Sequence, residues 1–517
     1  MAEQITTINP NGLNKDISQY ELPDNVWSDG NNIEFDNDKT KKINGHRQIF
    51  GSLSVAPYWL LPFTTPTVNY WLYPSLTKIY RTDGTIQTDI TRTTGGDYSA
   101  TAAHGWNGGV LGGVAILNNG VDAPQQFGTV SSACADLSNW DTNHRCSVIR
   151  PFKEFLVALD MTESSTRYPF RVRWSHPAEG GTVPVTWDET DTTKDAGYVD
   201  LSQTNGWVVD CLPLKDYNII YKEDSVWSMS YEGGQSIFRF TQLFNDEGII
   251  SRRCVKSYDN NHFVVSHDNV YIHNGQTKKS VIDNTMREEL FNSINADYYD
   301  RTFVAPNYEK NEMWVCIVSG ANTTDAFADK AFVYNWVNNT WSKRDLPHTP
   351  HIGWGIISSA SGTTDWSDSD GWDTDTSTWD FRGYNPSQSS MLIADPTNSK
   401  LFEADITNQF DTTNYYSWVE KTGIMLGSPT MKSIKKIIPR ISGSGSVDFY
   451  IGSEINPNEG ITWKGPYTFT PGTHSEIPVR ATGKYIGVKV ESNSDKTWSL
   501  DNLEIHWSPA GMRTNAI

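Results

Sequence analysis

Cysteine is scarce in this chain, and long apolar runs are missing. The 517 residues include five widely spaced cysteines without the close pairs typical of zinc ligands: Cys134, Cys146, Cys211, Cys254 and Cys316. Such thiols are expected to be buried in a protein that folds in a reducing cytoplasm. No apolar run approaches the ~20 residues of a membrane span, and the start MAEQITTINPNG lacks the features of a signal peptide. We therefore expect no membrane insertion.

Basic residues are also under-represented. The chain has 42 Lys and Arg against 61 Asp and Glu, a net charge of −19. A surface that grips nucleic acid needs a basic stripe, and the sequence shows none. An acidic surface would let DNA slide past without sticking, although solubility alone would also explain it. The most basic stretch holds Lys39, Lys41, Lys42 and Arg47. It is either an arm that docks on an acidic partner or neighbouring copy, or a solvated hairpin.

Signatures of catalysis are missing as well. The chain has no His-Glu-x-x-His, no Gly-x-Ser-x-Gly and no Walker loop. His348 and His351 are three residues apart, but Pro350 between them disfavours the helix that would align them as ligands. The glycine-rich stretch 105–120 lacks the Lys-Ser or Lys-Thr of a phosphate loop, so it is better explained as a tightly packed strand near a propeller axis. We therefore predict a non-enzyme with no catalytic, cofactor-binding or metal-binding residues and no cofactor.

What the chain does have is aromatic residues and turn formers. It contains 20 Trp, 23 Tyr and 20 Phe with 39 Gly and 24 Pro, which favours an all-β protein. The stretch 262–282, HFVVSHDNVYIHNGQTKKSVI, alternates apolar and polar residues between tight turns and predicts strands that form one propeller blade. Its histidines, His262, His267 and His273, are expected at exposed strand and turn positions. One short helix is predicted at 284–295.

Similar two-strand units recur along the chain. They share an apolar strand followed by a strand with an aromatic residue near a turn, and six of them lie at 69–85, 154–177, 218–234, 262–282, 312–347 and 390–405. This repetition favours a β-propeller of six blades over a multi-sheet sandwich of ordinary hairpins. We predict a polar N-terminal arm with a first strand at 1–50, the propeller with loop insertions at 51–410, and a C-terminal β-sandwich-like region at 411–517.

One segment, 363–381, is rich in aspartate and tryptophan. Its six carboxylates are Asp365, Asp368, Asp370, Asp373, Asp375 and Asp380. Aligned on Gly371 as an EF-hand loop, it places Trp366 and Ser377 where oxygen ligands are needed, so that motif fails. The sialidase Asp-box is approached but not matched. A long acidic loop held to the surface by its tryptophans is favoured over adventitious Ca²⁺ binding.

Several stretches together resemble one protein family. They are NGLNKDISQYELPDNVWSDGNNIEFDNDKTKKINGHRQIFG at the start, GIISRRCVKSYDNNHFVVSHDNVYIHNG, NEMWVCIV and AFVYNWVNNTWSKRDLP in the middle, and GKYIGVKVES with LDNLEIHWSPAGMR at the end. These phrases are similar to those of the tail nozzle, or tail tubular, proteins of short-tailed bacteriophages. The resemblance is weakest over 86–210.

The resemblance implies a structural virion protein of the tail, made and assembled in the host cytoplasm. Six copies would form a ring below the portal and its tail adaptor protein. The ring would form the channel through which phage DNA passes without tight binding, and it would hold tail fibres or a tip protein. We expect part of the six-aspartate loop to line the lumen or rim. The alternative is a carbohydrate-binding or glycoside-hydrolysing propeller, because tryptophans such as Trp366, Trp372 and Trp379 can stack on sugar rings.

Overall fold

The regular structure is almost entirely β-strand. The structure, a computed structural model, describes residues 4–510 except 10, 66, 67, 235, 358–388, 429 and 458. Within these residues the strands form seven four-stranded sheets, one five-stranded sheet and one six-stranded sheet, and neighbouring strands of each sheet are antiparallel. The predicted all-β class is confirmed.

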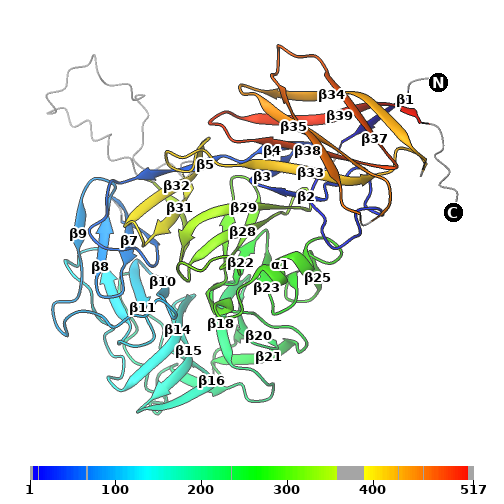
Figure 1. Cartoon of the computed structure of the whole chain (residues 1–517). Helices are drawn as coiled ribbons and strands as arrows, with labels where there is room; N and C mark the ends of the chain where they lie inside the picture. The colour runs from blue at the N-terminus through cyan, green and yellow to red at the C-terminus, as the bar shows by residue number, and fades with distance from the viewer. Residues whose placement is uncertain are drawn as a thin grey trace, which may run out of the picture.

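The seven four-stranded sheets are the blades of a β-propeller, and their colours in Figure 1 run round the ring from blue to yellow. The first blade consists of β6 (Leu61–Thr64), β7 (Asn69–Pro74), β8 (Ile79–Thr82) and β9 (Gln87–Asp89). The second consists of β10 (Asn107–Leu111), β11 (Val114–Asn118), β12 (Gln125–Gly128) and β13 (Ala135–Asp136). The third consists of β14 (His144–Phe152), β15 (Phe155–Glu163), β16 (Thr166–Trp174) and β17 (Gly197–Asp200).

The next three blades follow the same chain order. The fourth consists of β18 (Val208–Leu214), β19 (Tyr217–Lys222), β20 (Val226–Tyr231) and β21 (Phe238–Phe244). The fifth consists of β22 (Val255–Tyr258), β23 (Asn261–Val265), β24 (Val270–His273) and β25 (Lys278–Ser280). The sixth consists of β26 (Phe303–Asn307), β27 (Glu312–Ile317), β28 (Ala328–Asn335) and β29 (Thr340–Thr349). The first strand of each blade lies innermost, because β10 contacts β14 and each later first strand contacts the next, round to β30, which contacts β6.

The last blade joins the two ends of the propeller sequence. It consists of β30 (Ile352–Ile356), β31 (Ser389–Asp395), β32 (Lys400–Thr407) and, from near the N-terminus, β5 (Gly45–Ile49). Strand β5 pairs with β32, and Figure 1 shows it in blue beside the yellow strands. A strand from the start of the chain therefore closes the ring.

The predicted number of blades is wrong by one. Each of the six predicted units is a blade or part of one, but a seventh four-stranded sheet, β10–β13, lies at 107–136. Its first strand belongs to the glycine-rich stretch, which was expected near the axis and does lie innermost. A side chain at Gly108 would collide with the backbone oxygen of Ile116 at 1.9 Å, and one at Gly109 would meet Pro151 of the next blade at 2.8 Å. Glycine is required by close packing here, and its abundance hides the alternation that marks the other blades.

The remaining strands form a two-sheet sandwich at one side of the propeller (Figure 1). One sheet has the order β3-β4-β39-β34-β37 with β1 also on β39, and the other has the order β2-β33-β38-β35-β36. The bounds are β1 (Gln4–Ile8), β2 (Asp29–Asn31), β3 (Ile33–Asp36), β4 (Lys39–Lys42), β33 (Ser417–Ile424), β34 (Lys432–Gly443), β35 (Val447–Glu454), β36 (Thr462–Phe469), β37 (Ile477–Gly483), β38 (Tyr485–Ser492) and β39 (Trp498–Pro509). Residues 1–50 are thus not a separate arm, because β1 to β4 complete the sandwich and β5 completes the propeller.

The N-terminal segment also fastens the sandwich to the propeller. The amide of Leu13 donates to the carbonyl of Trp341, and the amide of Lys15 donates to the carbonyl of Thr285, at 3.1 and 2.7 Å. The predicted helix is present as α1 (Arg287–Ser293), and the carboxylate of Asp16 accepts hydrogen bonds from the first two amides of that helix. Buried apolar residues of the sandwich, of the N-terminal segment and of three blades, β18–β21, β22–β25 and β26–β29, form one continuous core. The two parts are therefore one packed body.

Asn32 is central to this junction. It is buried in a left-handed conformation (φ 55°), its amide group donates to Asp345 at 2.7 Å and to the carbonyl of Tyr416 at 2.8 Å, and its carbonyl accepts from the amide of Asp345 at 2.9 Å. Asn32→Ala should lower the free energy of unfolding by about 2–4 kcal/mol, because buried partners lose their bonds. Denaturant unfolding measures this. Asn31→Ala is the control, since Asn31 makes a single bond to Asp345 and should cost about 1 kcal/mol or less. Equal losses would contradict the central role of Asn32.

Candidate functional site

The structure tests some of the residues singled out from the sequence and does not describe others. The six-aspartate loop, Asp365 to Asp380, lies outside the described residues, so its position is not part of the structure. The five cysteines are buried and unpaired, as expected. Among the described residues no group of three or more His, Cys, Asp or Glu side chains is arranged to hold a metal ion. No described helix is long and apolar enough to cross a membrane.

The predicted exposure of the histidines is wrong for two of the three. His262 and His273 are 0% and 1% exposed and flank the hydroxyl of Tyr221 at 2.7 and 2.6 Å. His262 Nε2 donates to the carbonyl of Pro213, so its Nδ1 accepts from Tyr221; His273 Nδ1 accepts from the amide of Gly275, so its Nε2 donates to Tyr221. Burial lowers the pKa of both imidazoles, to about 4 and about 3. These neutral rings form a satisfied hydrogen-bonded chain between two blades and not a ligand set.

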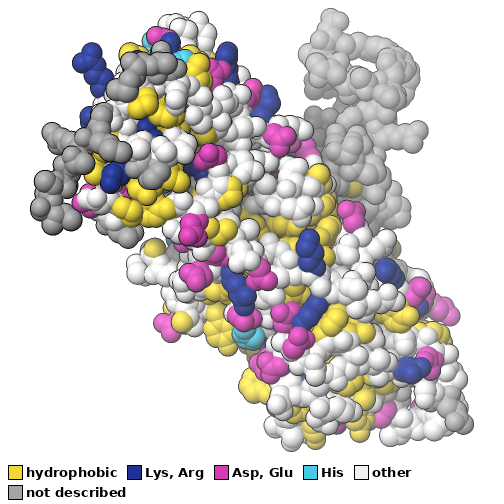
Figure 2. Space-filling view, turned by 90° about the vertical axis from the view of Figure 1, so that its right-hand side faces the viewer, with side chains coloured by type: hydrophobic (Ala, Val, Ile, Leu, Met, Phe, Trp, Pro, Cys, Tyr) yellow, Lys and Arg dark blue, Asp and Glu magenta, His cyan; other side chains and the backbone are white. Residues whose placement is uncertain are grey.

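The basic stretch at 39–47 is not a free docking arm. Lys39 pairs with Asp501 and Lys41 pairs with Asp36 in the β3–β4 hairpin. Lys42 is 3% exposed, donates to the carbonyls of Asn408 and Ser494, and lies over the ring of Tyr415. Burial lowers the pKa of Lys42 to about 8. The stretch therefore fastens sandwich to propeller. On the face in Figure 2, basic and acidic side chains are interspersed and no basic stripe is seen.

A group of charged side chains lies on and next to three of the inner strands. Arg150 lies on β14, Asp210 on β18 and Lys256 on β22, while Arg252 and Arg253 stand just before β22. We call Arg150, Arg252, Arg253 and Lys256 the axial cationic cluster. Contacts between blades that are not neighbours place it at the axis.

These cross-ring contacts come from the two consecutive arginines. Arg252 Nη1 donates to the hydroxyl of Ser147, two blades away, at 2.9 Å. Arg253 Nη1 donates to the carbonyl of Pro350, which precedes β30, at 3.3 Å. A Cβ added to Gly105, at the start of the β10 blade, would lie 3.8 Å from Arg253 Nη2. Only at the centre of the ring do side chains from these blades meet.

Asp210 is the carboxylate that organises the cluster. Arg150 binds it through both oxygens at 2.9 Å, and the amides of Arg253 and Cys211 donate to it at 3.0 and 2.9 Å. Burial alone would raise the pKa of Asp210, but the charge of Arg150 and these hydrogen bonds outweigh it and hold the pKa below its usual value. Arg253 adopts φ 69°, which is uncommon for a non-glycine residue, and its amide bond to Asp210 supports that conformation.

A second charged cluster lies where the sandwich meets the propeller. Lys310 pairs with Glu34 at 2.6 Å, and Asp405 pairs with Arg344 at 3.0 Å while the guanidinium of Arg344 covers Trp314. Buried Glu312 accepts a hydrogen bond from the Trp314 indole at 2.9 Å. Burial, with the charges of Glu34 and Asp405, raises the pKa of Glu312 to about 7 despite the nearby Lys310. Glu312 is therefore the group here that titrates near neutrality.

This shift predicts a pH-dependent stability. Because the pKa of Glu312 is higher in the folded state than the ordinary 4.5, folded protein binds the proton more tightly, and stability should fall as pH rises from about 4.5 to about 7. Glu312→Gln, which keeps the acceptor for Trp314, should match wild type near pH 4.5 and be more stable by about 1–3 kcal/mol at pH 8. Denaturant unfolding at both pH values measures this, with exposed Glu309→Gln as the control. A Glu312→Gln advantage that is equal at the two pH values would contradict the assignment.

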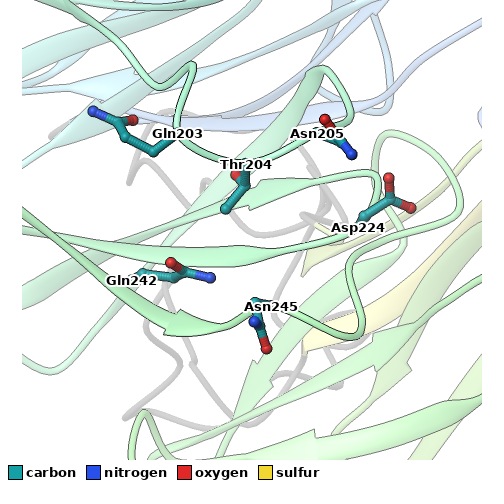
Figure 3. A pocket seen from close by; sticks show the side chains of 6 residues that line it. All are labelled: Gln203, Thr204, Asn205, Asp224, Gln242 and Asn245. Atoms are coloured by element: carbon teal, nitrogen blue, oxygen red, sulfur yellow. The ribbon is translucent and has the colours of Figure 1, made fainter.

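A polar hollow of about 330 Å³ lies at the edge of the β18–β21 blade. Figure 3 shows its lining side chains, Gln203, Thr204, Asn205, Asp224, Gln242 and Asn245. Thr204 is already engaged, since its hydroxyl accepts from Lys222 Nζ and from the indole of Trp227. The hollow thus offers amide groups and one carboxylate, which are donors and acceptors suited to hydroxyl-rich ligands.

No family model matches the chain, and no curated protein matches it. Among solved structures, the WD40 β-propeller domain of Doa1 aligns with a TM-score of 0.35 and 8% identity, over 69% of this chain and 95% of that domain. The propeller assignment itself rests on the sheet order and the ring of inner strands described above.

The axial cationic cluster was not predicted, although its residues are plain in the sequence. The feature of the sequence that could have pointed to the cluster is the pair of consecutive arginines, Arg252 and Arg253, just before a strand. A search for a contiguous basic stripe does not find such a cluster, because its members are 150 and 252–256 in the sequence and meet only when the ring closes.

Proposed function

We propose that the protein is a structural subunit of a short-tailed bacteriophage tail, a nozzle protein whose copies form a six-membered ring around the DNA exit channel. The observation that carries the proposal is the single packed body formed by propeller and sandwich. The junction hydrogen bonds, the Lys343–Asp29 and Lys310–Glu34 ion pairs and the shared core hold the two parts together. A wall that carries load during DNA ejection needs such a rigid unit.

The charge of the chain supports the same proposal. A net charge of −19 and a surface of interspersed charges disfavour retention of passing DNA. In this proposal the ring binds a tail adaptor protein above and tail fibres or a tip below, without inserting into a membrane. The six-aspartate loop is proposed to face the lumen or rim.

Electron microscopy and mass measurement of the purified protein test the proposal. We expect particles of six times the 58.1-kDa chain with sixfold symmetry, and labelling of the tail end in virions. A gel-shift assay at low salt should show no retention of duplex DNA. A protein that stays monomeric, alone and with its adaptor, and is missing from the tail would refute the proposal.

A carbohydrate-binding propeller is the second candidate, and the polar hollow is the observation that favours it. Trp207 is exposed and comes shortly after Gln203, Thr204 and Asn205 in the same loop. The guanidinium carbon of Arg167 lies over its ring, 4.1 Å from the ring centre. Hydrolysis by the usual route needs two carboxyl groups, and the lining supplies Asp224 alone, so this candidate is a binding protein. A glycan array tests it with Gln242→Ala and, as the control, Gln87→Ala in another blade. Specific binding lost in Gln242→Ala alone would support it, and no binding would dismiss it.

A further inference from the structure

The axial cationic cluster carries more positive charge than its surroundings neutralise. Asp210 is the carboxylate bound to it, and both of its oxygens are used by Arg150 and by backbone amides. Among the residues that the structure describes, three cationic groups therefore remain without a carboxylate: Arg252, Arg253 and Lys256. Their hydrogen bonds go to a hydroxyl and a carbonyl, and Lys256 Nζ has no acceptor among the residues that the structure describes.

This excess is unusual for its location. The chain has 19 more acidic than basic residues, yet three uncompensated cations sit together at the centre of one domain. Like charges close together in a partly desolvated place repel one another strongly. Burial and the charge of Arg150, with a further contribution from Arg253, lower the pKa of Lys256 to about 8, and burial with Arg252 and Arg150 lowers that of Arg253 to about 10.

The cluster also has the geometry of a prepared site. Arg252, Arg253 and Lys256 are half-buried, so their donors remain within reach of a solute. Arg150 is fixed by Asp210 and by the carbonyl of Gly108, and Arg253 is fixed through its amide. Positively charged donors that are fixed in advance suit an anion with several oxygen atoms, because guanidinium groups bind phosphate oxygens in pairs.

We propose that the axial cationic cluster is a binding site for a phosphate-type oxyanion, held by Arg252, Arg253 and Lys256 at the centre of the propeller. The ion supplies the negative charge that the described part of the chain does not provide there. It also links blades that are not neighbours and stabilises the closed ring. The phosphate comes either from solution or from the end of a nucleic acid strand. This proposal is independent of the nozzle function.

Thermal unfolding and calorimetry with inorganic phosphate test the proposal. At about 10 mM phosphate, against chloride of equal ionic strength, we expect the wild-type Tm to rise by about 2–4 °C. Lys256→Met should weaken phosphate binding at least tenfold and, without phosphate, leave Tm unchanged or higher, because a repelling charge is removed. Lys279→Met is the matched control, since Lys279 is exposed on the outer strand of the same blade, and should respond as wild type does.

A second variant keeps the test decisive if Lys256→Met does not fold. Arg252→Gln should show the same loss of phosphate response. The proposal would be overturned by a wild type that neither gains Tm from phosphate beyond chloride nor binds a 5′-phosphorylated strand, or by a response that is equal in wild type and both variants. An added arm compares a 5′-phosphorylated with an unphosphorylated single-stranded oligonucleotide. Binding of the phosphorylated strand alone identifies a strand end as the source, and binding of inorganic phosphate without either strand identifies the free ion.

Discussion

Asp210→Asn is expected to lower the free energy of unfolding by about 3–5 kcal/mol at pH 7. The substitution keeps the shape of the side chain but leaves Arg150 at the axis without its counter-charge. In the wild type, both carboxylate oxygens accept hydrogen bonds from the backbone amides of Cys211 and Arg253. In the variant, the NH₂ group of the asparagine would face one of these backbone N–H donors and could not accept its hydrogen bond. The side chain of Asp210 is 2% exposed, so water cannot compensate for the loss. Denaturant unfolding of both proteins measures the difference.

The Arg171–Asp200 pair supplies the control. Arg171 binds Asp200 through both oxygens at 2.8 and 2.9 Å, the same geometry as Arg150 and Asp210, but the Asp200 side chain is 41% exposed. Asp200→Asn should therefore cost about 1 kcal/mol or less. Because the folded state lowers the pKa of Asp210, its stabilisation is present above the ordinary pKa of about 3.9 and is lost as pH falls below it, so wild type and Asp210→Asn should converge in acid. Equal costs for the two substitutions would contradict the burial argument.

Removal of the N-terminal strands should have the largest effect of all. A chain that begins at Gly45 keeps β5 but loses β1 to β4, together with buried Trp27, Ile33 and Phe35. The sandwich then has unpaired edges on β39 and β33 and an open core, so we expect it to unfold or aggregate while the propeller stays closed. A chain that begins at Gly51 also loses β5, and its last blade opens. We expect this second chain to yield no folded propeller.

Limited proteolysis with mass spectrometry distinguishes these outcomes. The chain that begins at Gly45 should give a protected fragment that spans the blades, and the chain that begins at Gly51 should be degraded throughout. A chain that begins at Asn9, which lacks β1 alone, is the control and should resist proteolysis as the full chain does. If the Gly45 and Gly51 chains are protected equally, β5 does not close the ring in solution.

The fold could be predicted where short apolar runs stand between turn residues. Strands such as β23 and β24 bury nearly all of their side chains, and their two apolar runs, followed by Asn-Gly at 274–275, reveal them. The missed blade lacks this pattern, because close approach at the axis selects glycine at Gly108 and Gly109. The role of β5 could not be predicted from local pattern at all, since its partner β32 is about 350 residues away in the sequence.

The site was harder to predict than the fold. The histidines of 262–273 alternate as exposed residues would, yet they are buried because Tyr221 of the preceding blade supplies a hydroxyl partner. Lys42 belongs to a basic stretch in the sequence but meets carbonyls at 408 and 494 in the fold. Polar side chains become buried when distant segments bring partners, and the order of residues along the chain does not show those partners.

Closure of the ring by β5 has a consequence for synthesis. The first 49 residues leave the ribosome before their partner strands exist, because β32 begins at Lys400 and β33 at Ser417. At ordinary elongation rates the delay is about 20–70 s. Throughout that time Trp27, Ile33 and Phe35 are without their final partners. The nascent chain thus carries an apolar, strand-forming segment for most of its translation, and this protein should depend on a holding chaperone that binds its first residues.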